Sequence, residues 1–333
     1  MVRGAVAPAE RDALATRAAV IVRPGLALFR LTGGGRIACL QGLVTCDLLA
    51  PGDDTHLFGA LLTAKGMIVS PLWITRLADA LMIEAPAAAA PAVSAVLERF
   101  FPPRLCHWEE VTAGSASVGV YGPAAGALLA AATGGAPPSA VGRVAPLRCG
   151  GASVIAARVV ARGLDGFECL VPAPAATGVV EQLTARGARV IAPVLLEERR
   201  ILDGFPRLGA EIDEKTLPQE VRLDELGAVS YTKGCYLGQE TVARIHFRGH
   251  ANRYLAGLAL EREPETLPLD ILEGEQAVGR LTSACWWEAG GAWVGLSVVR
   301  RGVKPGSVVT LADGAAATAR ELPWEPLHAG GAP

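Results

Sequence analysis

An octapeptide at residues 233–240, KGCYLGQE, holds more reactive and hydrogen-bonding side chains than any other stretch of the chain. Cys235 follows Lys233 by two residues, and a neighbouring cation favours the thiolate form of a cysteine. A thiolate can act as a nucleophile, as a metal ligand or as a redox-sensitive group. We therefore expect Cys235 to carry the chemistry of the site, with Lys233 tuning it.

The other residues of the octapeptide suit a flat, nitrogen-rich ligand. Gly234 and Gly238 allow a tight turn or a close approach of the backbone to a ligand. Gln239 offers a donor and an acceptor, and Glu240 can accept from amino or ring N–H groups. A pterin-like ring would match this pair. The competing interpretation is a glycine-rich turn into a helix, in which Glu240 only favours the first helical turn.

Residues 233–253 are the most basic part of the chain, and residues 197–225 before them are acidic. Salt bridges between the two stretches are one explanation. The other is that Arg244 and Arg248 form a basic rim for an anionic tail such as polyglutamate or RNA phosphate. The sequence leaves both open.

The spacing of the cysteines and histidines does not indicate a metal site or a set of disulfides. The seven cysteines, at positions 39, 46, 106, 149, 169, 235 and 285, are odd in number, and no two have C-x-x-C spacing. This pattern is typical neither of a disulfide framework nor of a zinc motif. We expect most of these cysteines to be buried as small apolar residues. His246 and His250 could share a helix face, but no carboxylate completes a metal triad at familiar spacing.

Length and charge restrict the class of protein. A chain of 333 residues, of which 51% are hydrophobic, is long enough for two or three domains. Its formal net charge of −2 offers no overall case for binding nucleic acid or a membrane surface. The N-terminus lacks the pattern of a signal peptide, and no uncharged apolar run reaches about 18 residues. We therefore expect a cytoplasmic protein without a membrane partner.

Two α+β units are expected before the octapeptide, because strand-like and helical patterns alternate without the regular rhythm of a parallel sheet. Strand patterns cover residues 26–31, 57–62, 67–75 and 80–84 in the first unit and 117–121, 144–147, 154–160 and 167–171 in the second. Helical patterns cover residues 10–20, 86–101, 123–132, 175–185 and 193–203, and residues 36–49 are amphipathic. Whether the two units are distant repeats stays open.

The part of the chain after residue 254 has a different character. Short runs of β-forming residues at 278–281, 293–299 and 308–311 are cut by glycine and proline, which suits a small β-barrel. Trp286, Trp287 and Trp293 are most simply core or rim residues of that barrel. Base stacking is the less favoured alternative, given the neutral charge around them.

The octapeptide also resembles the KGCYxGQE signature of YgfZ-type folate-binding proteins, a branch of the glycine-cleavage T-protein (aminomethyltransferase) superfamily. Residues 40–47, 62–66, 207–220 and 279–283 are similar to further segments of that superfamily, in the same order. The resemblance adds two residues, Gln41 and Lys65, to the expected site. It implies these cofactor-binding residues: Gln41, Lys65, Gly234, Tyr236, Gly238, Gln239, Glu240, Arg244 and Arg248.

The resemblance implies an α+β fold of three domains around a central hole, with antiparallel sheets and helices in the first two domains and a small C-terminal β-barrel. The expected division is residues 1–110 for the first domain, sharing elements with 195–250, and 111–194 for the second. Residues 195–250 then form a connection whose signature lines the central cavity, and residues 251–333 form the barrel.

The function that this resemblance implies is accessory. The protein would bind tetrahydrofolate or a related folate and assist the assembly or repair of iron–sulfur enzymes, including those that modify tRNA. Its partners would be iron–sulfur assembly factors or client enzymes, and Cys235 would ligate a cluster transiently.

Differences between this sequence and the aminomethyltransferases distinguish the transferase branch of the superfamily from the YgfZ-type branch. Where aminomethyltransferases carry a pair of aspartates, this chain has Val69 and Ser70, and an expected asparagine is Pro86. Without such a carboxylate, no evident group manages the proton on the amine or folate nitrogen. A glutamate that holds the pterin in the transferases corresponds to Leu202 here. These differences argue against a true aminomethyltransferase.

Two alternatives to the accessory role follow. The first is a folate-dependent aminomethyl or one-carbon transferase, in which Glu84 or Asp47 replaces the missing aspartates. The second is a binding scaffold whose basic segment contacts an acidic partner or RNA.

Overall fold

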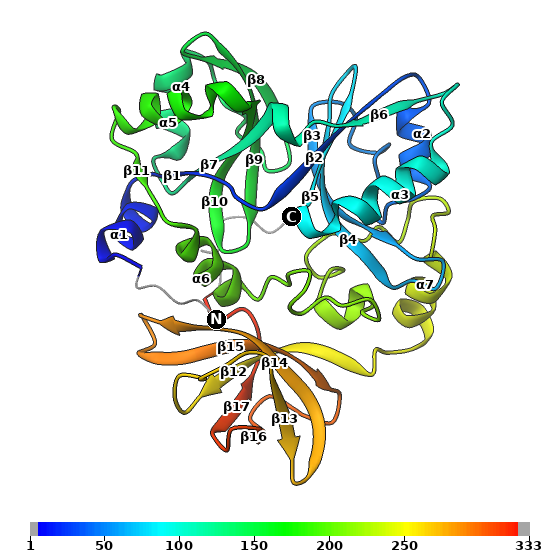
Figure 1. Ribbon diagram of the computed structural model, residues 1–333, viewed down its shortest axis with the longest axis vertical. Helices are drawn as coiled ribbons and strands as arrows, with labels where there is room; N and C mark the ends of the chain where they lie inside the picture. The colour runs from blue at the N-terminus through cyan, green and yellow to red at the C-terminus, as the bar shows by residue number, and fades with distance from the viewer. Residues whose placement is uncertain (1–5, 326–333) are drawn as a thin grey trace.

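Two neighbouring sheets and a closed barrel make up the molecule, with a helical connection between them (Figure 1). The structure is a computed structural model, and it describes residues 6–325. This is the expected α+β architecture with a C-terminal barrel. Within the described residues, no helix is long and apolar enough to cross a membrane.

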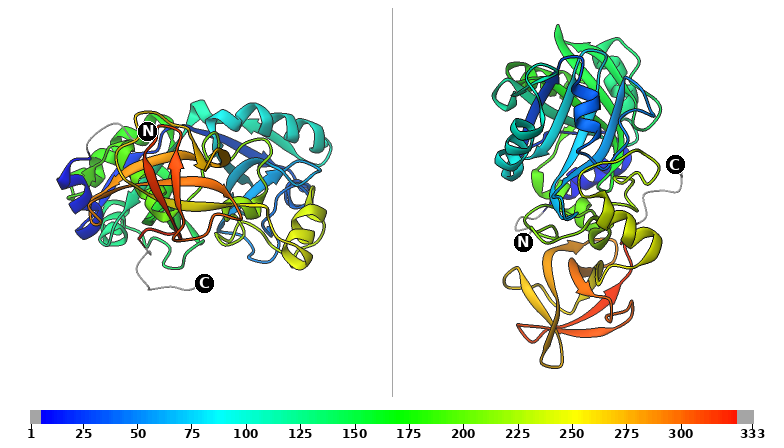
Figure 2. Two further views of the ribbon diagram at one scale, coloured as in Figure 1. Left: turned by 90° about the horizontal axis from the view of Figure 1, so that it is seen from below. Right: turned by 90° about the vertical axis from the view of Figure 1, so that its right-hand side faces the viewer.

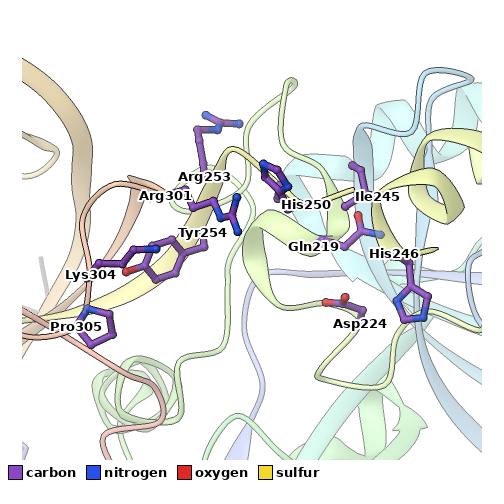
Figure 3. A pocket seen from close by; sticks show the side chains of 11 residues that line it. Gln219, Asp224, Ile245, His246, His250, Arg253, Tyr254, Arg301, Lys304 and Pro305 are labelled. Atoms are coloured by element: carbon purple, nitrogen blue, oxygen red, sulfur yellow. The ribbon is translucent and has the colours of Figure 1, made fainter. Parts of the chain in front are cut away.

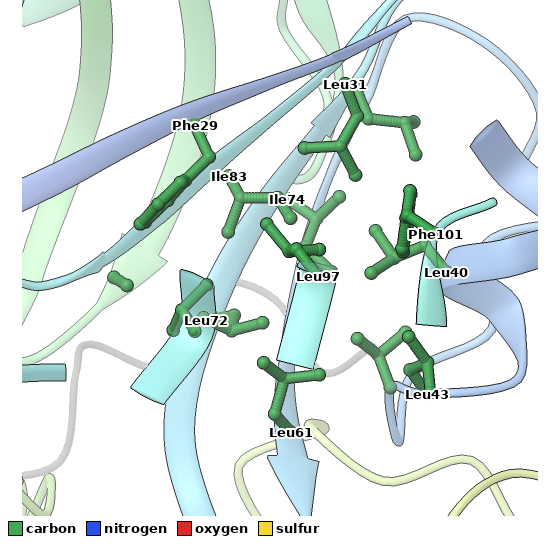
Figure 4. Close-up of a cluster of buried hydrophobic side chains, with 14 of the residues drawn as sticks. Phe29, Leu31, Leu40, Leu43, Leu61, Leu72, Ile74, Ile83, Leu97 and Phe101 are labelled. Carbon is green, nitrogen blue, oxygen red and sulfur yellow. The ribbon is translucent and has the colours of Figure 1, made fainter. Parts of the chain in front are cut away.

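The first sheet has the strand order β3-β4-β5-β2-β6, and all its neighbours are antiparallel. Its strands are β2 (Leu26–Thr32), β3 (Thr55–Leu62), β4 (Ile68–Arg76), β5 (Leu81–Pro86) and β6 (His107–Glu110). Helices α2 (Arg36–Gln41) and α3 (Ala90–Phe100) pack against it, with η1 (Ala87–Ala89) leading into α3. Apolar residues alternate along β2 and β4, so Phe29, Leu31, Leu72 and Ile74 meet Leu97 of α3 in one core (Figure 4).

The second sheet has the order β11-β1-β7-β10-β9-β8, and only the β1–β11 pair is parallel. Its strands are β1 (Ala19–Val22), β7 (Ser115–Tyr121), β8 (Val144–Cys149), β9 (Ala152–Ala161), β10 (Leu164–Pro172) and β11 (Arg189–Val190). The helices of this unit are α1 (Pro8–Thr16), α4 (Ala125–Thr133) and α5 (Ala176–Thr184), with η2 (Thr112–Gly114) and η3 (Ala173–Ala175) beside them. The chain therefore enters the second sheet before it forms the first, a pairing that the boundary at residue 110 did not include.

The two units repeat one arrangement, which the sequence had left open. In each, a strand is followed by a helix, three meandering strands, a 3₁₀ turn, a second helix and an edge strand. The sheet orders correspond as well, because β3-β4-β5-β2-β6 matches β8-β9-β10-β7-β11 once β1 is inserted before β11. Backbone hydrogen bonds connect the two units directly, because His56 N donates to Gly142 O and Val144 N donates to Asp54 O.

Residues 191–252 connect the sheets to the barrel. This connection holds α6 (Pro193–Asp203), η4 (Pro218–Val221) and α7 (Gln239–Arg248). Helix α6 lies between the second sheet and the barrel (Figure 1), and its Ile201 and Leu202 are buried against Leu255 and Leu296 of the barrel. Leu202, at the place of the transferases' pterin-holding glutamate, is thus a packing residue.

The barrel closes in the order β12-β15-β14-β13-β16-β17. Its strands are β12 (Arg253–Leu260), β13 (Leu269–Glu273), β14 (Gln276–Trp287), β15 (Ala292–Arg300), β16 (Val308–Leu311) and β17 (Ala316–Arg320). The right-hand view of Figure 2 shows it below the two sheets. Trp286 is 38% exposed and lies edge-on to Trp293, whose ring packs against the barrel core.

Most expected elements are present with shifted ends, and the bounds of α6 match the prediction. The helix expected over residues 10–20 ends at Thr16, because Ala19 and Val20 pair with Tyr121 and Val120 of β7. The amphipathic stretch 36–49 is helical only to Gln41. Strands β1, β6, β11, β12, β13 and β17 were not predicted. Strands β1, β6, β11 and β12 pair with strands that are distant in sequence, whereas β13 and β17 form hairpins with the neighbouring β14 and β16.

Candidate functional site

A cavity of about 730 Å³ lies where the two sheets meet α6. Strands β3, β4 and β5 of the first sheet contribute Phe58, Trp73 and Glu84 to its wall. The second unit contributes Tyr121 and Arg162, and α6 with the segment after it contributes another set: Glu197, Arg200, Phe205 and Arg207. Volumes of about 300–1,000 Å³ are typical of small-molecule sites.

Aromatic rings form one wall of this cavity. Trp73 stacks on Phe58, with 4.7 Å between ring centroids, and on His56, with 5.0 Å. Phe205 packs against Phe58 at 5.1 Å, and the guanidinium of Arg162 lies 5.3 Å from the Trp73 ring centroid. These aromatic and cationic surfaces suit a flat, electron-rich ligand.

Buried charges behind the wall neutralise one another. Arg23 is 9% exposed, and its Nη1 donates to Glu84 Oε1 at 2.8 Å and to Glu168 Oε2 at 2.6 Å. Arg162 also forms an ion pair with Glu168. The hydroxyl of Tyr121 donates a hydrogen bond to Glu168 Oε1 at 3.3 Å. Burial alone would raise the pKa of Glu168, but the charges of Arg162 and Arg23 outweigh it and lower that pKa to about 2. This carboxylate therefore remains ionised.

His56 is buried beside the same network. Its Nδ1 lies 2.9 Å from Thr75 Oγ1, while its Nε2 has no hydrogen-bond partner within residues 6–325. Burial lowers the pKa of His56, although the nearby Glu168 opposes the shift. A neutral imidazole therefore packs behind Trp73 near neutral pH.

A second buried arginine supports the α6 wall. Arg200 donates to Glu197 through Nε at 2.8 Å and through Nη2 at 2.7 Å, and its Nη1 donates to Glu211 at 3.0 Å. Glu197 Oε1 also lies 3.5 Å from Nη2 of Arg207, whose side chain is 52% exposed. Burial would raise the pKa of Glu197, but hydrogen bonds and charge from Arg200 lower it. The cavity thus combines aromatic rings, two carboxylates and a solvent-accessible guanidinium.

The octapeptide lies elsewhere, and its lysine has a structural role. Lys233 is 7% exposed, and its Nζ donates at 2.7 Å to each of three carbonyl oxygens, those of Gln41, Val44 and Cys46. Burial lowers the pKa of Lys233 to about 8, and the nearby Asp47 opposes this effect. All three ammonium protons are therefore directed at the loop of residues 41–46. This corrects the expectation that Lys233 serves mainly to tune Cys235.

Three segments that resemble family motifs meet around this lysine, and we call residues 41–47, 63–66 and 233–240 the signature cluster. Leu237 N donates to Gly42 O at 3.0 Å. Gly238 precedes α7 with φ +83°, and a Cβ there would lie 2.4 Å from Thr63 O. Gln41 completes the loop, because its Nε2 donates to Asp47 and its Oε1 accepts from Leu48 N.

None of the eleven residues expected from the sequence lines the central cavity. The prediction that the octapeptide lines it is therefore wrong, although the earlier part of segment 195–250 does line it. The physical reason is that Lys233 and Gln41 hold a loop, while Gln239 and Glu240 begin α7 on the outside. The residues concerned are Lys233, Cys235, Gln41, Lys65, Gly234, Tyr236, Gly238, Gln239, Glu240, Arg244 and Arg248.

Most residues of the cavity wall were not predicted from the sequence. Phe58, Trp73, Arg162 and Phe205 come from four separate segments and carry no motif, so no local signal identifies them. Strand alternation does place Trp73 on the same face as Pro71, which also lines the cavity. Only the fold brings these side chains together.

Cys235 is exposed, whereas the other described cysteines are buried or, for Cys39, half-buried. Tyr236 is 7% exposed and lies under the Lys233 ammonium, 5.2 Å from ring centroid to Nζ. No group of three or more His, Cys, Asp or Glu side chains in residues 6–325 is arranged to hold a metal ion. The thiol can thus reach a partner, and it belongs to no such group of three ligands among the described residues.

The positions of the transferase acids carry no carboxylate. Ser70 is fully buried, and its hydroxyl donates to Pro71 O. Asp47 accepts from Leu49 N and from Gln41, so it stabilises a turn outside the cavity. Glu84 does line the cavity, although it is paired with Arg23.

One arginine of the basic stretch 233–253 forms a salt bridge with the acidic stretch, and two others are exposed. Arg253 forms an ion pair with Glu220 at 2.8 Å, as the salt-bridge account predicts. Arg244 and Arg248 are exposed on α7, and neither forms an ion pair within the described residues.

Comparisons with known proteins agree with this architecture. The model of the GCVT N-terminal domain family matches residues 4–231. The tRNA-modifying protein YgfZ of Yersinia pseudotuberculosis serotype O:1b (strain IP 31758) is 30% identical over 308 residues, covering 88% of this chain and 87% of that protein. A chloroplastic protein of Arabidopsis thaliana is 30% identical over 164 residues, which are 48% of this chain but only 37% of that protein.

A solved structure shares the fold. Glycine cleavage system aminomethyltransferase T from Bartonella henselae matches with a TM-score of 0.83 at 21% sequence identity, over 95% of this chain and 89% of that chain.

Proposed function

The chain belongs to the GCVT N-terminal domain family as a YgfZ-type member, and from this premise we propose that it binds a folate in the central cavity. The protein acts as an accessory factor for iron–sulfur enzymes, including enzymes that modify tRNA. Tetrahydrofolate or a related folate is the ligand, and the exposed Cys235 thiol contacts a client or its cluster.

The observation that carries the folate proposal is the composition of the cavity wall. A pterin ring is flat and carries amino and ring N–H groups, which match an aromatic wall beside the carboxylates of Glu84 and Glu197. Arg207 is accessible to solvent at the same cavity and can bind the carboxylate of the glutamate tail. The volume of about 730 Å³ accommodates such a ligand.

An accessory role is supported by what surrounds the thiol. Within the described residues, the exposed Cys235 belongs to no group of three ligands that could hold a cluster, but its thiol can complete the ligand set of a cluster that a partner presents. The name of the Yersinia relative, tRNA-modifying protein YgfZ, connects that protein with tRNA modification. These two observations together support client enzymes that modify tRNA with iron–sulfur chemistry.

The folate proposal is tested by calorimetric titration of 5-formyltetrahydrofolate into the wild type and into Trp73→Ala. We expect the variant to bind at least about tenfold more weakly, because it loses a large part of the aromatic wall. Trp286→Ala removes an exposed barrel tryptophan and is the matched control. Arg207→Ala, at a half-exposed site, should weaken binding without affecting folding. Equal affinity in all four proteins, or no binding to the wild type, would reject the proposal.

The role of the thiol is tested separately in cells that depend on this protein. Cys235→Ala should lower the level of tRNA modifications made by iron–sulfur enzymes, while the purified variant binds folate as the wild type does. The thiol lies outside the cavity, which is why the two properties should separate. Cys149→Ala removes a buried thiol and is the control. Unchanged modification levels in the Cys235→Ala cells would contradict the role.

A folate-dependent one-carbon transferase is the second candidate, because Glu84 is a carboxylate at the cavity. Against this candidate, Glu84 is held in an ion pair with Arg23, and positions 69 and 70 carry no acid. Folate-dependent release of formaldehyde from aminomethyl or N-methyl donors, abolished in Glu84→Gln, would favour the transferase over the accessory role.

A further inference from the structure

A second pocket, of about 410 Å³, lies between the C-terminal end of α7 and the barrel (Figure 3). We call it the α7–barrel pocket. It shares no lining residue with the central cavity. The proposed folate binding does not involve this pocket, and its lining side chains differ in chemical type from those of the central cavity. The side chains that the argument uses are Gln219, Asp224, His250, Arg253, Arg301 and Lys304.

Positive charge predominates in the α7–barrel pocket. Arg301 and Lys304 are exposed on the loop after β15, and within residues 6–325 neither forms an ion pair. Figure 3 shows them with Arg253 on the barrel side, opposite His250 on the α7 side. Among the described residues that line the pocket, Asp224 alone has a carboxylate, which accepts from the Tyr231 hydroxyl at 3.4 Å. This local excess contrasts with the formal charge of −2 for the whole chain.

An unsatisfied acceptor lies in the same lining. Gln219 donates through Nε2 to Val242 O at 2.9 Å and to the Tyr231 hydroxyl at 3.2 Å, which fixes the orientation of its amide. Its Oε1 is buried and has no donor within the described residues. A buried acceptor without a donor is unfavourable. A ligand hydroxyl or amino group would therefore be stabilised here.

Aromatic rings adjoin the pocket on α7. His246, which lines it, stacks on Tyr231 with 3.6 Å between ring centroids. Phe247 follows with its side chain 66% exposed, edge-on to His246 at 4.7 Å. Exposed rings next to unpaired cations are the pattern by which proteins bind single-stranded nucleic acid, with stacking for the bases and cations for the phosphates.

We propose that the α7–barrel pocket and Phe247 bind single-stranded RNA. Arg301 and Lys304 contact phosphates, Phe247 stacks on a base, and Gln219 Oε1 accepts from a ribose 2′-hydroxyl. The 2′-hydroxyl distinguishes RNA from DNA at such a contact. An acidic peptide would satisfy the cations but would leave Phe247 unused. RNA binding is independent of folate binding, since the two sites share no residue.

The test is fluorescence anisotropy with a labelled 12-nucleotide oligouridylate at two salt concentrations. Arg301→Glu/Lys304→Glu should weaken binding at least tenfold and reduce the salt dependence, because two phosphate contacts are lost. Phe247→Ala should weaken it by roughly fivefold or more through lost stacking. Arg104→Glu/Arg148→Glu reverses two exposed arginines elsewhere and should bind as the wild type does. All of these changes are on exposed side chains, and circular dichroism checks that the variants fold.

The same measurements decide against the proposal in four cases. These are no binding to the wild type at low salt, equal loss in the control variant, and equal affinity for the matching deoxyribose oligonucleotide. The fourth is a combination of two results: inorganic polyphosphate displaces the oligouridylate at equal phosphate concentration, and Phe247→Ala binds the oligouridylate as tightly as the wild type does. That last result would mean that only an unspecific polyanion is bound.

Discussion

Lys233 and Cys235 are two residues apart in the chain but have opposite surroundings. The lysine is 7% exposed and is bonded to three carbonyl oxygens, whereas the thiol is exposed. An ammonium group can donate three hydrogen bonds, and here all three end on one loop. Lys233 therefore fixes the loop of residues 41–46, whereas the Cys235 thiol is accessible from solvent.

The structural role of Lys233 predicts a large loss of stability in Lys233→Met. Three carbonyl oxygens lose their donor, two of them in buried hydrogen bonds, so we expect the free energy of unfolding to fall by about 3 kcal/mol. Urea denaturation measures it. Lys215→Met, at an exposed lysine, is the control and should change stability little. A loss below about 1 kcal/mol for Lys233→Met would show that these bonds contribute little.

At the scale of elements, the signature cluster depends on a close approach of two backbones. The turn at residues 63–66 contacts the residue before α7, where Gly238 has φ +83°. A helix can begin there only if that residue has no side chain. Motifs that are about 170 residues apart in sequence are thus parts of one structural unit.

Two glycines of the octapeptide provide a matched pair of substitutions. In Gly238→Ala the Cβ would lie 2.4 Å from Thr63 O, in a left-handed backbone conformation, so we expect a loss of about 2 kcal/mol or more. In Gly234→Ala the Cβ meets nothing within 4 Å, so stability should remain within about 0.5 kcal/mol. Thermal unfolding compares the two. Similar melting temperatures for both variants would contradict the close approach.

At the scale of the whole molecule, Arg23 joins the two sheets beside the cavity. It follows β1 of the second sheet and bonds to Glu84 in β5 of the first and to Glu168 in β10 of the second. Removing one member of a buried ion-pair network leaves the others uncompensated. The relative position of the two cavity walls therefore depends on charge pairing.

This network predicts how stability depends on pH. The pKa of Glu168 is about 2 in the folded protein, below its ordinary value of 4.5, so the unfolded chain binds the extra proton first as the pH falls. Stability from this group is complete above about pH 5 and is lost progressively toward pH 2, by roughly 3 kcal/mol in total. Denaturant unfolding at a series of pH values measures it.

Glu168→Gln is the comparison for that series. The variant should be less stable near neutral pH, because Arg23 and Arg162 lose a charged partner. Its stability should also change less between pH 5 and pH 2 than that of the wild type. Parallel pH curves for the two proteins would show that Glu168 is not the responsible group.

Local pattern was sufficient for a large part of this protein. The α+β class, the bounds of α6, the meander of the first sheet and the C-terminal barrel follow from periodicity and from glycine and proline positions, because these signals act over a few residues. The octapeptide and its companion segments identified the family for the same reason. The place of β1 in the second sheet was not predictable, since it depends on pairing with β7, about 100 residues away.

The location of the candidate site was decided by tertiary structure alone. Lys233, Gln41 and Gly238 are prominent in the sequence because a tightly packed loop and helix start need those residue types, and a ligand site could need the same types. Trp73, Phe58, Arg162 and Glu197 have no motif, yet the closing of two sheets on α6 gathers them around one cavity. Side chains from distant segments meet only through the packing of the fold, so residue type and spacing identified the family while the tertiary structure determined where a ligand fits.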